Sequence, residues 1–140
     1  MYCVQKIAED ILYVGASDRR LALFENVYPT PRGVSYNAYL VLDEKTVLLD
    51  AVEEAVAVRF QENLEHSLGG RSLDYVVVNH MEPDHSASLA GVLRRWPKAQ
   101  VVGNAKTLTM LAQFTGEDLS GRAVAVKEGD TLSTGRHTFT

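Results

Sequence analysis

One short segment of the chain gathers the side chains that could do chemistry. Residues 79–86 read Asn-His-Met-Glu-Pro-Asp-His-Ser, and four of these side chains are able to ligate a metal: His80, Glu82, Asp84 and His85. Imidazole and carboxylate ligands without a thiolate suit iron or manganese as well as zinc, whereas a structural zinc site more often recruits cysteine. Because carboxylates also offer bridging oxygens, the segment predicts a metal site that two ions could share.

The position of the segment in the chain also favours a site. It follows residues 75–79, a nearly continuous apolar run that is typical of a strand buried on both faces. An α/β sheet usually places its functional loop at the end of such a strand. Pro83 stiffens the loop between the two carboxylates. Half-buried carboxylates beside imidazoles are unfavourable unless a cation neutralises them, which again indicates a metal.

A solvated loop with a helix cap is the alternative interpretation of this segment. Asp84 or Ser86 would then cap the helix that follows, and Glu82 would lie in solvent. This alternative is the better one for any single residue here, but the weaker one for four such residues on one short loop. A serine hydrolase is disfavoured further, because no Gly-X-Ser-X-Gly elbow is present in the chain.

The first third of the chain predicts strands and turns. Short β-branched runs indicate strands at residues 4–7, 11–14 and 21–27, and a strand pair at 35–42 and 46–50. Residues 28–33 predict a loop, because each proline there fixes φ and pushes its predecessor out of the helical region. This part of the chain therefore predicts an antiparallel β section.

The rest of the chain alternates between helices and strands. Apolar stripes predict helices over residues 53–68, 86–96 and 107–114, the first ending at two glycines and the second at a proline. Apolar runs predict strands at residues 75–79, 100–103, 123–126 and 137–140. Such alternation indicates an α/β fold, a mixed sheet with helices on at least one face.

Composition sets limits on the class of protein. The chain has 140 residues, the length of one domain or part of a larger one, with 46% apolar and 23% charged residues, as in ordinary globular proteins. Its net charge of −4 argues against a nucleic-acid partner. The single cysteine, Cys3, excludes an internal disulfide and indicates a reducing compartment. No apolar run approaches the roughly 18 residues of a membrane span, so we expect a cytoplasmic protein without a membrane partner.

The spacing His80-X-Glu82-X-Asp84-His85 resembles the motif of the flavodiiron proteins, whose amino-terminal domain has the metallo-β-lactamase fold. Related zinc hydrolases of that fold carry histidine where this chain has Glu82. The glutamate at this position therefore makes the motif similar to that of the iron-binding branch. Further segments resemble the family in the family's order, at residues 28–33, 35–37, 48–50, 75–80 and 127–130. The resemblance implies an αββα sandwich, with residues 1–140 forming the amino-terminal half of this di-iron domain.

Residue by residue, the resemblance implies that His80 and Glu82 ligate one iron and that Asp84 and His85 ligate the other. Asp50 resembles the family's acidic residue that supports these ligands from behind, as such carboxylates commonly do. A helix cap is the equally weighted alternative for Asp50.

The other histidines and the cysteine match no ligand of the family. We expect His66 to be a surface residue or a partner of the helix dipole near the end of the first helix. We expect His137, in the last strand, to be structural, and Cys3 to be a small buried or edge hydrophobe.

The activity that the resemblance implies is reduction of dioxygen to water, or of nitric oxide to nitrous oxide, at a di-iron centre. FMN delivers the electrons in such proteins, and rubredoxin or a flavin reductase supplies them. Two alternatives stay open: a zinc-dependent hydrolase of the metallo-β-lactamase fold, and a non-catalytic oxygen-sensing or interaction module.

The chain also departs from the family's pattern. Family members draw a histidine, a bridging aspartate and another histidine from sequence that would lie beyond Thr140, and they usually carry a flavodoxin-like FMN module, which is absent here. We therefore expect a fragment that binds metal weakly or not at all and is inactive alone. Half a sandwich would leave an apolar face uncovered, and we expect a second copy to cover it in a homodimer.

Overall fold

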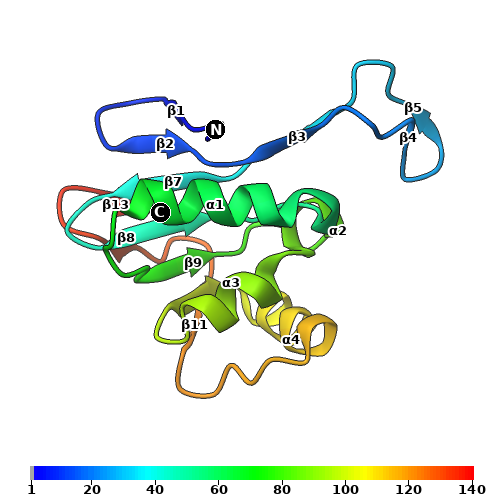
Figure 1. The fold of residues 1–140 in the computed structure, drawn as a ribbon. Coiled ribbons are helices and arrows are strands. Elements are labelled where there is room, and N and C mark those ends of the chain that lie inside the picture. Colours follow the sequence, from blue (N-terminus) through cyan, green and yellow to red (C-terminus); the bar gives the residue numbers. More distant parts are fainter. Residues whose placement is uncertain (1) are drawn as a thin grey trace.

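The computed structural model describes residues 2–140 and contains a seven-stranded mixed sheet with helices packed on one face (Figure 1). Adjacent strands are antiparallel from β1 to β8 and parallel from β8 to β11. This confirms the predicted α/β class, with its antiparallel first part. The strands, in their order across the sheet, are β1 (Gln5–Lys6), β2 (Ile11–Tyr13), β7 (Tyr39–Leu42), β8 (Thr46–Leu49), β9 (Tyr75–Val77), β10 (Gln100–Gly103) and β11 (Ala123–Ala125).

The helices over residues 57–68, 89–95 and 105–115 form where the apolar stripes predict them, whereas residues 83–86, predicted mostly as a loop, form a further short helix. The helical elements are a 3₁₀ turn, η1 (Glu54–Val56), followed by α1 (Ala57–Leu68), α2 (Pro83–Ser86), α3 (Leu89–Arg95) and α4 (Ala105–Thr115). Helix α1 ends at Gly69, which adopts a left-handed φ of 57° and donates its N–H to the Glu65 carbonyl. This is the predicted glycine stop. None of the helices in residues 2–140 is long and apolar enough for a membrane crossing.

The core lies between the sheet and these helices. Alternate residues of the central strands point to the helical face because side chains alternate along a strand. They form one buried cluster with residues of α1, α3 and α4, which includes Leu40, Leu48, Val76, Val101, Phe60, Leu64, Leu93 and Leu111. Burial of these large side chains is the main force that holds the helices on the sheet.

The single strand predicted over residues 35–42 is two strands in the structure. β6 (Val34–Tyr36) pairs with β3 (Ala16–Asp18), while β7 pairs with β2 in the main sheet. At the break, the buried Asn63 amide of α1 donates to the carbonyls of Val14 and Gly15 at 3.2 and 2.9 Å. Because the Asn63 side chain forms hydrogen bonds with these carbonyls, they do not pair with a neighbouring strand. This accounts for the interruption of the β-ladder between the two strand pairs.

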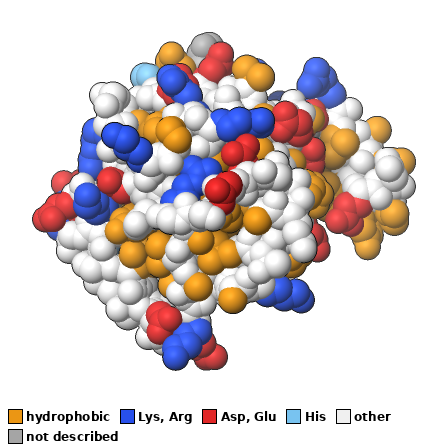
Figure 2. All heavy atoms as spheres, turned by 90° about the horizontal axis from the view of Figure 1, so that it is seen from below, with side chains coloured by type: hydrophobic (Ala, Val, Ile, Leu, Met, Phe, Trp, Pro, Cys, Tyr) orange, Lys and Arg blue, Asp and Glu red, His pale blue; other side chains and the backbone are white. Residues whose placement is uncertain are grey.

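The strand predicted over residues 21–27 is mostly loop. Only β4 (Leu23–Phe24) forms there, and it pairs with β5 (Tyr28–Pro29), inside the segment predicted as a loop. These strands make an arm that projects from the body and exposes Leu23, Val27 and Tyr28 (Figures 1 and 2). The turn at its tip needs positive φ values at Glu25 and Asn26, which sequence patterns of apolar residues do not reveal.

The sheet face opposite the helices is only partly open, which corrects the expectation of an uncovered face. Val41, Val47 and Val102 are buried there, while Leu49 and Val77 are half-buried. The C-terminal segment runs behind the sheet on this side (Figure 1) and ends in the hairpin β12 (Leu132–Ser133) and β13 (Thr138–Phe139). Hydrophobic side chains also gather on the underside of the body (Figure 2). The homodimer contact stays a prediction.

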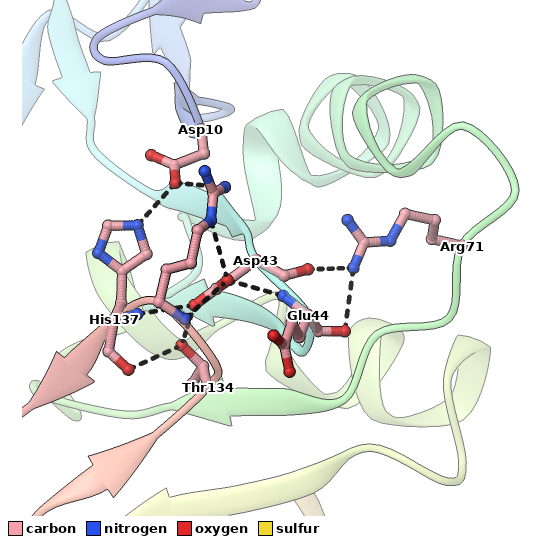
Figure 3. Close-up of polar contacts among 7 residues, drawn as sticks. Asp10, Asp43, Glu44, Arg71, Thr134 and His137 are labelled. Carbon is pink, nitrogen blue, oxygen red and sulfur yellow. Dashed lines mark hydrogen bonds and ion pairs between the residues drawn. The ribbon is translucent and has the colours of Figure 1, made fainter.

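Asp43, in the turn between β7 and β8, fastens the C-terminal hairpin to the sheet (Figure 3). Its side chain is fully buried. It accepts hydrogen bonds from the Thr134 hydroxyl at 2.9 Å and from the backbone N–H groups of Glu44, Arg136 and His137 at 2.8, 3.1 and 2.9 Å. A buried carboxylate is stable only when it is satisfied in this way.

Asp10 holds the same hairpin from a second side. Its carboxylate contacts the His137 ring at 2.7 Å and the Arg136 guanidinium at 2.9 Å. The hydrogen bond with His137 holds the pKa of Asp10 below its ordinary value, against the smaller opposing effect of burial. His137 is therefore a structural residue, as predicted, although it lies just before β13 rather than within it.

We predict that Asp43→Asn lowers the unfolding midpoint of the chain by several degrees at pH 7. Burial alone would raise the pKa of Asp43, but the N–H groups of His137, Arg136 and Glu44 and the Thr134 hydroxyl outweigh it and hold the pKa well below its usual range. A depressed folded-state pKa means that the ionised group stabilises the fold above about pH 4 and loses this effect as the pH falls further.

Thermal unfolding followed by circular dichroism between pH 7 and pH 2 tests this. The difference between wild type and Asp43→Asn should shrink steadily below about pH 4. A difference that is independent of pH, or no difference at pH 7, would contradict the assigned role of the carboxylate.

Candidate metal centre

The predicted metal-binding segment lies at the carboxyl end of β9, beside the end of β8. These two strands are parallel, and Leu49 pairs with Val77 in their register. Asp50 and the loop at residues 78–82 therefore leave the sheet at the same edge. The Asp50 N–H donates to the Val77 carbonyl at 2.9 Å and extends the pairing by one residue. Functional loops of open α/β sheets gather at this edge.

Asp50 adopts a conformation that is rare for a residue other than glycine. Its φ is 57°, in the left-handed region. In this position its Oδ1 accepts a hydrogen bond from the Asn79 backbone N–H at 2.7 Å, and its Oδ2 lies 3.4 Å from the Asn79 amide nitrogen. The alternative of a helix cap is wrong for Asp50, because Glu53 caps η1. Asp50 instead ties the two loops together.

Two serines fix the segment that follows. The Ser86 hydroxyl donates to the carbonyls of Met81 and Glu82 at 2.8 and 3.0 Å. The buried Ser88 hydroxyl donates to the Val52 carbonyl at 2.8 Å and accepts from the Val52 N–H at 3.1 Å. The helix predicted over residues 86–96 corresponds to α3 at residues 89–95, and near Ser88 it is separated from α2, which lies almost wholly in the predicted loop.

The helix-cap alternatives for Asp84 and Ser86 are also wrong. Both residues lie within α2, which begins at Pro83 with Glu82 as its N-cap residue, and no side chain caps its first turn. Proline is favoured at this first helical position because its missing N–H would have no partner there. The short helix places Asp84 and His85 on successive positions directly after Pro83.

The four candidate ligands come together as two imidazole–carboxylate pairs. His80 Nε2 lies 3.3 Å from Glu82 Oε2, and His85 Nε2 lies 3.5 Å from Asp84 Oδ2. The two imidazole rings meet edge to face with centroids 5.1 Å apart. Ligand atoms of His80, Glu82 and Asp84 all lie within 4.8 Å of one another. Three of the four predicted residues thus offer ligand atoms to one small volume, and His85 borders it through its contacts with Asp84 and the His80 ring.

The cluster is open on one side. The side chains of His80 and Glu82 are 51% and 60% exposed, whereas those of Asp84 and His85 are 21% and 30% exposed. Asp50, behind His85, is 13% exposed. The loop therefore presents its first pair of candidate ligands to solvent and keeps its second pair against the protein.

The charges and unsatisfied atoms of the cluster fit a bound cation. Asp50, Glu82 and Asp84 make no ion pair with a lysine or arginine among residues 2–140. His85 Nδ1 is buried without a hydrogen-bond partner and lies 3.7 Å from Asp50 Oδ2. A metal-ligating histidine commonly directs its second ring nitrogen at a carboxylate, and the position of His85 between Asp84 and Asp50 matches this arrangement.

His66 and Cys3 make their contacts away from the cluster. His66 is in the last turn of α1, exposed, and stacked on the Tyr2 ring with centroids 3.9 Å apart. Cys3 is exposed, so it is not a buried hydrophobe; its backbone N–H donates to Asn63 Oδ1 at 3.0 Å, and the Arg59 guanidinium donates to its sulfur at 3.5 Å. Neither residue contributes to the centre.

Sequence patterns did not identify Asn79 or Ser88 as residues that shape the site, and they gave Ser86 only the role of a helix cap. Asn79 and Ser86 border the ligand motif, so their position was a usable signal. Ser88 gave no such signal in the sequence, because the residue with which it forms hydrogen bonds, Val52, is 36 positions away.

Comparisons with known proteins place these features in context. Residues 31–138 match the family model described as the metallo-beta-lactamase superfamily. A flavo-diiron protein of Clostridium acetobutylicum is 36% identical over 130 residues, which are 93% of this chain and 32% of that protein. A nitric oxide reductase of Moorella thermoacetica is 33% identical over 136 residues, 96% of this chain and 34% of that protein.

A solved structure, the rubredoxin oxygen:oxidoreductase of the anaerobe Desulfovibrio gigas, superposes with a TM-score of 0.88 at 28% identity, covering 96% of this chain and 33% of that one. The chain thus spans about a third of the length of each of these three proteins.

We predict that Asp50→Ala lowers the free energy of unfolding by about 1–3 kcal/mol, because it leaves the Asn79 N–H without its acceptor. Asp50→Asn is the matched control, since its amide oxygen can still accept that hydrogen bond and its effect should be smaller. Urea unfolding followed by circular dichroism measures both. Equal stability of wild type and Asp50→Ala would show that the contact does not hold the two loops together.

Proposed function

The chain belongs to the metallo-beta-lactamase superfamily and is matched along nearly its whole length by flavodiiron proteins, and from this we propose that it forms part of a di-iron domain that reduces dioxygen or nitric oxide. In this proposal His80 and Glu82 hold one iron and Asp84 and His85 hold the other. The relatives named as a nitric oxide reductase and as a rubredoxin oxygen:oxidoreductase support both gases as substrates.

The observation that carries the proposal is the pairing of each imidazole with a carboxylate. His80 meets Glu82, and Asp84 meets His85, at 3.3 and 3.5 Å. Mixed nitrogen and oxygen ligands of this kind suit iron, and zinc hydrolases of this fold carry histidine at the position of Glu82. Glu82 therefore favours iron over the zinc alternative.

The surrounding residues would orient these ligands rather than bind metal. Asp50 lies behind His85 Nδ1 and would fix the direction of its ring, while Ser86 and Ser88 hold the loop and α2 in register with the end of β8. A bound pair of irons would supply the redox chemistry and the binding of the gas, rather than activate water for hydrolysis.

The electron supply lies outside residues 1–140 in this proposal. FMN would come from a flavodoxin-like module outside residues 1–140, and rubredoxin or a flavin reductase would reduce it. The name of the Desulfovibrio gigas protein supports a rubredoxin-type donor. A homodimer and a cytoplasmic location remain part of the proposal.

We predict that a protein joining this chain to the remaining two thirds of the family's length holds two irons and consumes dioxygen or nitric oxide. Metal analysis and gas-electrode measurements with reduced FMN or rubredoxin test this. A product that contains zinc alone, and hydrolyses a phosphodiester or a lactam, would overturn the proposal in favour of the zinc hydrolase.

We also predict that the 140-residue chain alone holds iron weakly, because four ligands leave both coordination spheres incomplete. Anaerobic titration with Fe(II) and with Zn(II) should show that Glu82→His shifts the preference towards zinc by roughly tenfold, since imidazole replaces a carboxylate. Glu128→His, an exposed position outside the cluster, is the control. Two tightly held irons per wild-type chain, or no change of preference in Glu82→His, would contradict the assigned ligands.

A further inference from the structure

A cavity of about 360 Å³ lies directly beside the candidate metal centre. Pro83 and Asp84 of α2 line it, together with Leu23 and Phe24 of the β4–β5 arm and Tyr36 of β6. Asp84 is thus shared between the cavity and the cluster of candidate ligands. The arm, which projects from the body in Figure 1, supplies the leucine and phenylalanine side chains that line this cavity.

The charges around the cavity are all negative. Besides Asp84, the carboxylates of Asp18, Glu25 and Glu53 line it, and no lysine or arginine does. Arg20 compensates Asp18 with an ion contact of 3.7 Å. Glu25 and Glu53 make no ion pair among residues 2–140. An anion that enters therefore meets uncompensated like charge, whereas a neutral apolar molecule meets leucine and phenylalanine side chains.

Tyr36 adds a hydrogen-bond donor that the fold itself does not use. The residue is only 4% exposed and belongs to the core cluster, yet its hydroxyl makes no hydrogen bond within residues 2–140, although its backbone pairs with β3 and its carbonyl accepts from the Tyr13 hydroxyl. Burial, together with the nearby carboxylates Glu53, Asp18 and Asp84, raises the pKa of Tyr36. Those three carboxylates line the cavity as Tyr36 does, so the phenol faces it and keeps its proton.

We propose that this cavity is the pocket through which a small neutral molecule reaches Asp84, that Glu25 and Glu53 exclude anions from it, and that the Tyr36 hydroxyl donates a hydrogen bond to the molecule inside. The identity of that molecule, dioxygen or nitric oxide, rests on the proposed function. The selectivity for neutral over anionic molecules rests only on the residues that line the cavity.

Nuclear magnetic resonance of the metal-free 140-residue chain tests the pocket without any iron. Dissolved dioxygen under pressure is paramagnetic and speeds the relaxation of nuclei near which it resides. We expect the ring signals of Tyr36 and Phe24 to relax faster than the side-chain signals of Leu111 and Val92, which are fully buried elsewhere in the core. Sodium azide, titrated at constant ionic strength, should leave the Tyr36 and Phe24 signals in place.

Charge-neutralised variants test the exclusion of anions. In the double variant Glu25→Gln, Glu53→Gln, azide should shift the Tyr36 signal with an apparent affinity raised roughly tenfold. The amide oxygen introduced by Glu53→Gln can still accept the Glu54 N–H bond that Glu53 accepts in the wild type, so the local fold is kept. The matched control is Glu9→Gln, Glu128→Gln, which removes the same charge at exposed positions outside the cavity.

Tyr36→Phe tests the free hydroxyl. Because that hydroxyl has no partner in the fold, the variant should unfold at the same temperature as the wild type or slightly higher. A midpoint lowered by several degrees would assign the hydroxyl a structural partner and overturn its proposed role.

The pocket is refuted if azide binds the wild type as well as the charge-neutralised variant, or if dioxygen relaxes Tyr36 no faster than Leu111. These outcomes would leave the proposed iron ligands untouched. Conversely, a failure of iron binding would refute the proposed function without changing the selectivity of the cavity.

Discussion

The parallel pairing of β8 with β9 is the constraint on which the site depends. It brings Asp50 and the loop at residues 78–82 to one edge of the sheet. The hydrogen bond from the Asp50 N–H to the Val77 carbonyl fixes the position of the two segments relative to each other along the strand direction. The left-handed conformation of Asp50 then turns its carboxylate towards the Asn79 N–H instead of into solvent. A slip of one strand by one residue would turn its side chains to the opposite face relative to its partner and separate these groups.

The core enforces this register from the helical side. Leu48 and Val76 occupy neighbouring positions on the two strands and are fully buried against α1 and α3. Helix α1 contributes Phe60 and Leu64 at the spacing that one helical face requires. The site is therefore carried by rigid elements, while Pro83, the two serines and the contact between Asp50 and Asn79 shape the loop between them.

The sequence was sufficient for the main elements and for the four residues of the cluster, because both appear as local patterns. Periodicity marks α1 and its glycine stop, and the four candidate ligands lie within six residues. The features that could not be predicted from the sequence depend on contacts between residues far apart in the chain. The division of residues 35–42 into two strands depends on Asn63 in α1, and the break near Ser88 depends on Val52. Tyr36 carried no local signal either, since its significance comes from carboxylates on three other segments.

The buried carboxylate of Asp43 has a consequence for how the chain is made. Its partners Thr134 and His137 lie 91 and 94 positions later. During synthesis on the ribosome the β7–β8 turn must therefore wait, with its carboxylate hydrated, until nearly the whole segment has emerged. Contacts of such long range close late and slow the search for the native state. The first strands of the sheet can form early, but their outer turn is completed only when residues 134–137 have appeared.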